Sequence, residues 1–396
     1  MPQHPINLPT ARPAPLDLPV ELADLRRDRP LTRMVFPDGH EGWLVTSYTG
    51  VRDVLADPRF SRRSELLHRQ IARPGKATTP PPAPPGFFIG MDPPDHTRLR
   101  RHLTGQFTVR RMNQLQHRIG EIADDCLTAM VEHGPPMDLV EAFALPIPSL
   151  IICELLGVPY TERERFQRDT AALFSLESTK EEAAAAFASL TGFILSLVPG
   201  KRDNPTDDML SGLAANDALT DDEIAGMGML LLFAGHETTA SMLGLGVYAL
   251  LRHPEQLARI QADPGLVDNA VEELLRYLTI VHLGTLRTAL QDVEIDGHLI
   301  KKDECVSLSL PAANHDPARF TDPERLDVGR SAVGHVGFGH GIHQCLGQQL
   351  ARIVLRVGYA KLLARLPGLR PAVPLEDVPM RDAMAIYGVH SLPVTW

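Results

Sequence analysis

The sequence predicts a mainly α-helical fold with small β-sheets at intervals. Apolar residues recur at helical spacing in several long segments, most clearly over 220–251. Two short β-hairpins are indicated by the turns Pro37-Asp38-Gly39 and Asp296-Gly297, which lie between apolar and β-branched residues. With 396 residues, 44% of them hydrophobic and 22% charged, the chain can bury a large core. We expect a single domain over residues 1–396, with β-rich portions around 33–47 and 285–310.

An arm, the first hairpin and a proline-rich loop come first in the chain. Residues 1–30 contain seven prolines and no apolar run, so we expect a wrapped or loose arm rather than a signal peptide or a membrane anchor. Residues 61–90 lack periodicity and carry a run of prolines at 80–85. Such a segment is too long for a plain connector and is typical of a functional lid.

Helical patterns dominate the rest of the chain. Residues 200–207 are expected to form a polar linker, and residues 292–310 return to strands around the second hairpin. Helices are expected at 47–56, from His96 onward, at 112–132, at 147–156, as a pair within 161–196 separated around 175–180, at 220–251 and at 346–363.

The helix predicted at 220–251 carries polar residues where a buried helix should have none. Thr220-Asp221-Asp222-Glu223 forms a capping box, and the next twelve residues, 224–235, are uncharged. His236-Glu237-Thr238-Thr239 follows in mid-helix. Burying the Glu237 carboxylate is costly, and a mid-helix threonine can bond to a backbone carbonyl. The pattern indicates either a functional site or a solvated notch with a satisfied threonine.

A second unusual stretch is Phe338-Gly339-His340-Gly341-Ile342-His343-Gln344-Cys345-Leu346-Gly347. Its glycines allow the backbone to approach a flat ligand closely, and Cys345 lies just before the helix expected at 346–363. A helix N-terminus favours the thiolate, which is the form of cysteine that binds a metal. Two alternatives are a packed core cysteine and a zinc cluster of His340, His343 and Cys345, for which no fourth ligand is evident.

Cysteine usage and charge limit the functional classes. The other cysteines, Cys126, Cys153 and Cys305, lack short paired spacings, which argues against a disulfide framework and for a reducing compartment. The net charge of −10 disfavours nucleic acid, and no stretch approaches the roughly 20 apolar residues of a membrane span. Two basic stretches without acids, 96–120 and 328–375, are either solvated helix faces or a surface for an acidic partner.

The cysteine stretch, as Phe-x-x-Gly-x-His-x-Cys-x-Gly, resembles the haem-ligand loop of the cytochrome P450 superfamily. Ala234-Gly235-His236-Glu237-Thr238-Thr239 resembles its oxygen-activation motif. The resemblance implies the cytochrome P450 fold, with haem b (iron protoporphyrin IX) between the long central helix and the helix after the cysteine loop. It makes Cys345 the iron ligand, places Ala234 beside the haem, and gives Thr238 contact with dioxygen and Glu237 a part in proton delivery. No chemistry is assigned to His236.

Further motifs match the same superfamily along nearly the whole chain. Glu273-Leu274-Leu275-Arg276 resembles its structural Glu-x-x-Arg pair, although alone such a pair is usually a surface salt bridge. Asp322-Pro323-Glu324-Arg325-Leu326 resembles the downstream segment, which makes Arg325 the third member, with Leu326 where phenylalanine is commoner. Asp303 stands where these relatives usually have glycine. The resemblance further implies that the haem propionates are met by His96, Arg100, Arg287 and His343.

The expected function is that of a soluble, actinobacterial-type haem-thiolate monooxygenase of the cytoplasm. Such an enzyme inserts one atom of O2 into a C–H bond and reduces the other to water. Alternatives are a member of the same fold that performs epoxidation, desaturation or oxidative coupling, and a haem-binding sensor, against which the intact Glu237-Thr238 pair argues. No flavin or iron–sulfur motif is present, so we expect electrons from an acidic ferredoxin and an NAD(P)H-dependent ferredoxin reductase, and a monomer without nucleic-acid or membrane partners.

The substrate is expected to be a large, mostly apolar small molecule. The candidate pocket residues are uncharged, and apolar burial at about 25 cal/mol per Å2 would drive binding. A polyketide or macrolide, a terpenoid or a foreign compound is expected, in secondary metabolism such as antibiotic biosynthesis. The candidate pocket residues are Phe87, Phe88, Leu230, Phe233, Leu283, Thr285, Ala385 and Ile386.

Overall fold

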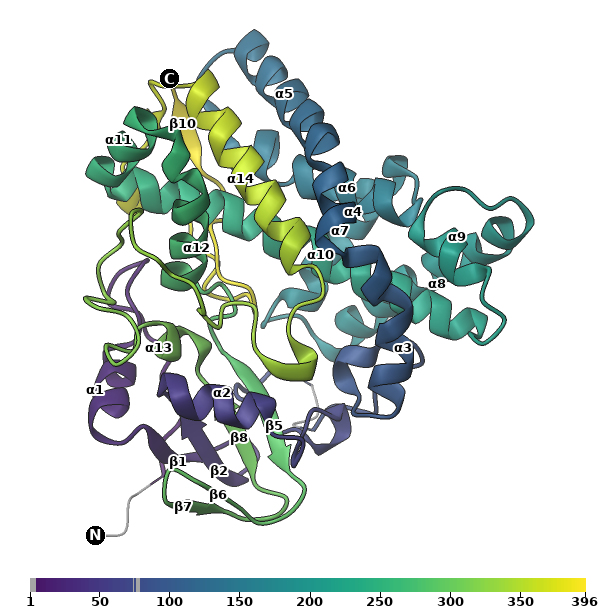
Figure 1. Ribbon diagram of the computed structural model, residues 1–396, viewed down its shortest axis with the longest axis vertical. Coiled ribbons are helices and arrows are strands. Elements are labelled where there is room, and N and C mark those ends of the chain that lie inside the picture. The colour runs from purple at the N-terminus through teal and green to yellow at the C-terminus, as the bar shows by residue number, and fades with distance from the viewer. Residues whose placement is uncertain (1–4, 74, 76–78) are drawn as a thin grey trace. The chain divides into compact units, whose positions relative to one another are not determined.

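The computed structural model describes residues 5–73, 75 and 79–396 (Figure 1). The chain divides into two compact units. Unit 1 comprises residues 1–83, 89–97 and 272–345, and unit 2 comprises residues 84–88, 98–271 and 346–396. The helices α3 (Asp95–Thr104) and α12 (Val267–Leu278) contribute residues to both units. The proline-rich lid expected at 61–90 lies partly outside the described residues.

Unit 1 is built on a five-stranded sheet in the order β1-β2-β8-β5-β3. β2 and β8 pair in parallel, and the other neighbours are antiparallel. Buried apolar side chains of α2 and of the sheet form the core of this unit. Its elements are α1 (Val20–Asp28), β1 (Leu31–Val35), β2 (Glu41–Val45), α2 (Tyr48–Ala56), β3 (Phe60–Ser61), β5 (Thr285–Ala289), β6 (Val293–Ile295), β7 (His298–Ile300), β8 (Cys305–Leu308) and α13 (Leu310–Asn314).

Both predicted hairpins are present in unit 1. β1 and β2 flank the first turn, with Arg33 opposite Trp43. β6 and β7 flank the second, where Asp296 and Gly297 have φ of 48° and 74°, the left-handed pair that a two-residue hairpin turn requires. Asp303 has φ of 70°, so it holds a conformation that a glycine would adopt at less cost.

The N-terminal arm is more structured than expected. The Ile6 amide donates to the Arg33 carbonyl at 3.0 Å, which attaches the arm to β1. The helix α1 was not predicted from the sequence. It is only nine residues long, and Leu22 and Leu25 are its only buried residues, so the apolar pattern is too short to stand out.

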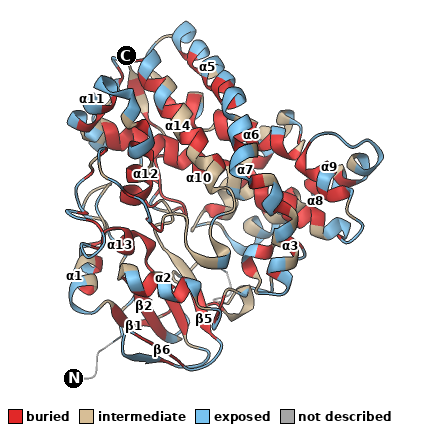
Figure 2. Cartoon of the chain, in the orientation of Figure 1, coloured by how far each residue is buried: buried red, intermediate tan, exposed pale blue. Residues whose placement is uncertain are grey.

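Unit 2 is a group of helices around α10 (Asp221–Arg252), which Figure 2 shows as mostly buried. The predicted capping box starts it: the Glu223 amide donates to Thr220 Oγ1 at 3.2 Å, and the Thr220 amide donates to Glu223 Oε2 at 3.0 Å. The remaining elements are α4 (Val109–Gln114), α5 (Gln116–His133), β4 (Met137–Asp138), α6 (Pro146–Leu156), α7 (Arg163–Phe174), α8 (Lys180–Asp203), α9 (Met209–Ala214), α11 (Pro254–Ala262), α14 (Gln348–Arg365), β9 (Arg370–Pro371) and β10 (Pro393–Thr395).

Several helices pack closely on α10. It contacts α6, α8 and α14, and α14 lies beside α5 (Figure 1). Tyr359 of α14 donates its hydroxyl to the Met242 carbonyl of α10 at 2.6 Å. The residues before α3 touch the start of α10: a Cβ on Gly86 would lie 2.2 Å from the Glu223 carbonyl oxygen, and one on Gly226 would lie 1.9 Å from the Pro85 oxygen. Only glycine fits at these two positions.

The helix α8 corrects two expectations. It continues to Asp203, through part of the polar linker predicted at 200–207. By length and composition it is also apolar enough to cross a membrane, whereas the sequence was expected to contain no such stretch. Its charged end is tied within the unit, because Arg202 binds Asp221 at 2.7 Å. A single helix of this kind is weak evidence for a membrane span.

The predicted Glu273–Arg276 pair is a fully buried ion pair of unit 1. Arg276 Nε lies 2.7 Å from Glu273 Oε2, and Arg276 Nη1 donates to the Asn314 and Pro323 carbonyls at 2.8 and 2.9 Å. The expected third member, Arg325, is wrong. Its side chain is exposed and only its carbonyl oxygen accepts, at 3.5 Å from Arg276. The second cation is Arg330, with Nε 3.0 Å from Glu273 Oε1.

We expect Arg276→Met to lower the free energy of unfolding by about 3–5 kcal/mol, because Glu273 keeps a buried charge with half of its cationic partners removed. Arg325→Gln is the matched control and should stay within about 0.5 kcal/mol of wild type, because its backbone carbonyl is retained. Denaturant titration of both variants measures the difference. Equal losses in the two variants would contradict the assignment.

Candidate active site

Cys345 ends the glycine-rich loop of unit 1. Its amide donates to the Phe338 carbonyl at 2.9 Å, which closes the loop on itself. Gly341 has φ of 72°, and a Cβ there would lie 2.4 Å from the Leu55 carbonyl oxygen, so the loop packs directly on α2. A Cβ on Gly339 would have nothing within 4 Å. The loop is therefore closely packed at Gly341 and open at Gly339.

Cys345 differs from the other cysteines in exposure. All four cysteines are free, but Cys345 alone is exposed. Burial raises the pKa of Cys126 to about 11, of Cys153 to about 12 and of Cys305 to about 11. Burial therefore disfavours the thiolate form at these three positions, whereas the exposed Cys345 does not carry that cost.

The zinc alternative finds no support in the side chains. Among the described residues, no three His, Cys, Asp or Glu side chains gather as ligands for one ion. His340 instead lies beside Arg52, with Nε2 3.4 Å from the guanidinium. The ring of His343 lies against the ring of His96, with centroids 4.3 Å apart.

Unit 1 also holds a buried cation that fits an anionic group. Arg287 lies on β5 and is 3% exposed, and its Nη1 donates to the Leu286 carbonyl at 2.8 Å. Within the described part of the chain it has no ion pair. Burial, with the nearby charge of Arg62, lowers the pKa of Arg287 to about 9. A buried guanidinium favours a carboxylate partner, so Arg287 fits a haem propionate. Arg62, the second cation near Arg287, was not among the predicted site residues, because no sequence motif includes it.

In unit 2, the middle of α10 carries the predicted acid and threonine. Thr238 Oγ1 donates to the Ala234 carbonyl at 2.8 Å, the local bond expected of a mid-helix threonine. Ala234 is exposed on the helix, whereas Glu237 is 3% exposed. Glu237 forms an ion pair with Arg381, which no motif in the sequence predicts. Arg100, on the part of α3 that belongs to unit 2, is half-buried.

The candidate pocket residues fall into separate groups. Phe233 of α10 stacks on Phe174 of α7, with ring centroids 4.2 Å apart, and the Ala385 amide donates to the Phe174 carbonyl at 2.8 Å. Phe87 contacts a different ring, that of Phe187 on α8. The other five candidates are buried or half-buried: Leu283 and Thr285 of unit 1 are half-buried, and Phe88, Leu230 and Ile386 are buried.

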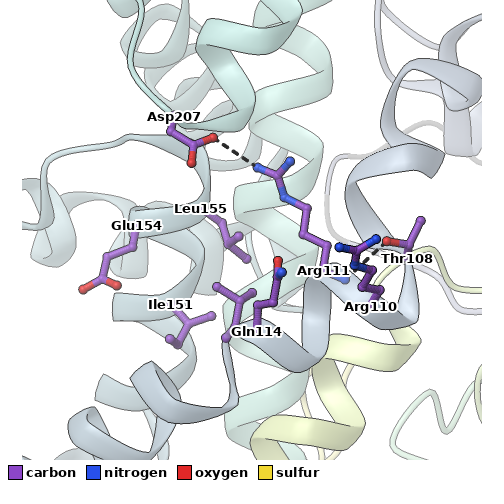
Figure 3. Close-up of a pocket in the computed structure, with 9 residues that line it drawn as sticks. Thr108, Arg110, Arg111, Gln114, Ile151, Glu154, Leu155 and Asp207 are labelled. Carbon is purple, nitrogen blue, oxygen red and sulfur yellow. Dashed lines mark hydrogen bonds and ion pairs between the residues drawn. The ribbon is translucent and has the colours of Figure 1, made fainter.

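A surface hollow of unit 2 does not coincide with any of these residues. It has a volume of about 560 Å3 and is lined by residues of α4, α6 and the segment after α8 (Figure 3). Arg111 crosses it to reach Asp207 at 3.6 Å. Because charged residues line it and no predicted site residue does, we assign it no part in the chemistry.

Comparison with known proteins identifies the family. The cytochrome P450 family model matches residues 196–264 and 265–383. "Cytochrome P450 105C1" of a Streptomyces species is 49% identical over 393 residues, 99% of each chain. "Vitamin D3 dihydroxylase" of Streptomyces griseolus is 42% identical over 395 residues, 98% of this chain and 96% of the relative. The crystal structure of CYP105P1 with filipin I superposes with a TM-score of 0.92 at 42% identity and covers 99% of each chain. This chain belongs to the cytochrome P450 family.

Proposed function

We propose that this cytochrome P450 monooxygenase hydroxylates a large, mostly apolar small molecule and that Cys345 is its iron ligand. The family binds haem b through a cysteine thiolate. The observation that carries the assignment is that Cys345 is the one exposed cysteine, while burial disfavours the thiolate form of the other three. By resemblance to the family, the propionates would be met by His96, Arg100, Arg287 and His343, and Ala234 would lie against the haem.

Haem with a thiolate ligand supplies the oxygen chemistry, since thiolate donation favours O–O cleavage. The chain itself supplies the ligand, the cations that neutralise the propionates and the groups that hold protons. Thr238 and Glu237 would be the groups that hold these protons. The Thr238 hydroxyl is held by its bond to the Ala234 carbonyl, and the Glu237 carboxylate is held by Arg381.

We expect Cys345→His to abolish the thiolate-type Soret band of the reduced carbon-monoxide complex, because imidazole replaces sulfur at the iron. Cys126→Ala, which changes a half-buried cysteine, should leave that band in place. Absorption spectra of the reduced proteins with carbon monoxide make the comparison. An unchanged band in Cys345→His would exclude this cysteine as the ligand.

We expect Thr238→Ala to keep haem content while lowering the product formed per NADPH by about 10-fold or more, because a positioned proton donor is lost. The missing reducing equivalents should appear as peroxide or excess water. Thr239→Ala is the matched control, since Thr239 makes the same kind of bond, to the Gly235 carbonyl at 3.2 Å. Equal coupling in the two variants would leave Thr238 a packing role only.

The electron donor is proposed to be an acidic ferredoxin, itself reduced by an NAD(P)H-dependent reductase. Basic residues of both stretches lie in unit 2, where α5 and α14 pack side by side (Figure 1). Some are neutralised within the chain, such as Lys361 by Asp124 at 2.6 Å and Arg118 by Glu154 at 2.7 Å. Arg110 is exposed without such a partner among the described residues.

Reduction of the haem iron by ferredoxin should slow as the salt concentration rises, because salt screens charges over about 8 Å at physiological ionic strength. We further propose a cytoplasmic monomer.

The substrate class is proposed from the apolar candidates and the relatives. Phe174, Phe233 and Ala385 form one apolar group, and no charged residue lies among the candidates. One similar protein is named a vitamin D3 dihydroxylase, and the crystal structure of another contains filipin I. A polyketide or macrolide, a terpenoid or a foreign compound of that size suits such a lining.

We expect large apolar compounds to shift the Soret band to shorter wavelength in optical titrations, and small charged acids to leave it unchanged. Phe233→Ala should weaken the apolar binding by about 10-fold, since a stacked ring contributes roughly 0.5–1.5 kcal/mol beyond its burial. Phe193→Ala, on a half-buried ring of α8, is the control. Shifts with the small charged acids alone would contradict the proposed substrate class.

A further inference from the structure

The partner of Glu237 comes from a distant part of the chain. Arg381 precedes β10 by twelve residues and is 8% exposed, and its Nη2 contacts Glu237 Oε1. The backbone around Arg381 is held in a narrow loop: its amide donates to the Gly388 carbonyl at 2.9 Å, and Met380 bridges to Val389. The ion pair therefore holds the guanidinium against α10, and the backbone that carries it is held within its own loop.

Three buried polar side-chain atoms near this ion pair lack a protein partner. Among the residues that the structure describes, His236 Nε2, Ser241 Oγ and Arg381 Nε lack a hydrogen bond. His236 Nε2 lies 3.9 Å from Glu237 Oε2. A Cβ on Gly388 would lie 3.2 Å from Arg381 Cδ and 3.3 Å from Ser241 Oγ, which places those side chains next to each other. Buried polar atoms of this kind are normally satisfied by ordered water.

The state of His236 makes its Nε2 an acceptor. The Nδ1 atom lies 2.8 Å from the Leu232 carbonyl, which can only accept, so Nδ1 carries the hydrogen. Burial lowers the pKa of His236, which favours the neutral ring. Its Nε2 can therefore accept a hydrogen bond from water beside the Glu237 carboxylate.

The loop that carries Arg381 also reaches solvent. His390 follows Val389 and is exposed, and its amide donates to the Pro379 carbonyl at 2.8 Å. Partial burial lowers the pKa of His390, and the charge of Arg381 lowers it further, while Glu237 and Asp382 act in the opposite direction. The bridge between Met380 and Val389 places the exposed His390 beside the backbone that carries Arg381.

We propose that Arg381 is a positioning residue for Glu237, and that water bound at His236 Nε2, Ser241 Oγ and Arg381 Nε carries protons to Glu237 from solvent near His390. This inference rests on the proposed part of Glu237 in proton delivery. A guanidinium does not give up its proton in proteins, so water and not Arg381 carries it. The Glu237 carboxylate accepts a proton from this water and passes it toward Thr238, and solvent replaces the proton that the water gave up.

The first test reads the protonation of Glu237 directly in the haem-loaded enzyme. In Arg381→Gln the buried carboxylate loses its cation, so it should bind a proton and add a carboxylic-acid C=O band to the infrared spectrum at neutral pH. The double variant Arg381→Gln/Glu237→Gln should lack that band, and Arg381→Lys should not gain it. The exposed-residue variant Arg325→Gln is the control.

The second test measures the water route. Ser241→Ala and His236→Phe each remove one water partner and keep the ion pair, and the phenyl ring retains the ring contact with Phe166. Both variants should lower product per NADPH by about 10-fold and raise the solvent isotope effect on product formation. If Arg381→Gln fails to fold with haem, the results for Ser241→Ala and His236→Phe still test the proposal.

The outcomes separate this inference from the function on which it rests. Wild-type coupling in Glu237→Gln would overturn the proton role of Glu237 itself. Loss of coupling in Glu237→Gln, together with no new infrared band in Arg381→Gln, would overturn the positioning role alone. Wild-type coupling and isotope effects in both Ser241→Ala and His236→Phe would overturn the water route.

Discussion

The arrangement of unit 2 depends on one constraint, which is that its long central helix is largely buried and carries an acid in its middle. Glu237 lies in the middle of α10, where a lone carboxylate would be prohibitively costly to bury. The chain meets this cost with Arg381, which ties the C-terminal loop to the central helix. The same loop supplies the Ala385 amide to the Phe174 carbonyl on α7. One ion pair thus helps to place two segments that border the apolar candidates for substrate contact.

Local signals predicted the features whose causes are local. The capping box at Thr220, the left-handed turn at Asp296 and Gly297, and the uncharged run of α10 each specify structure within a few residues of themselves, and all were found. Family motifs identified Cys345, Glu237 and Thr238 as candidates, and the exposure of Cys345 agrees with its proposed role. The end of α8 was missed because its last residues are polar and were therefore assigned to a linker. Their charges form ion pairs within the unit, and the helix continues through them.

Long-range partners could not be predicted from the sequence. Arg381 is 144 residues from Glu237, and no spacing rule relates a loop residue to a helix residue at that distance. The case of Glu273 is similar, because a downstream arginine was correctly expected in type but not in position. Arg330 rather than Arg325 has the reach and direction to meet Glu273 Oε1, and that depends on how the turn after Asp322 folds. The sequence can thus show that a buried charge needs a partner, but it does not show which residue supplies that partner.

The contact between Gly86 and Gly226 limits how this enzyme can be redesigned. Backbone meets backbone at these positions, with no room for a side chain on either residue. Loop exchange among relatives is a natural way to alter which molecules an enzyme accepts. A graft of the proline-rich segment onto this chain must therefore carry a glycine at position 86 in the same register, whatever else it changes. The close contact at these two glycines thus determines where a foreign loop can be joined to this chain.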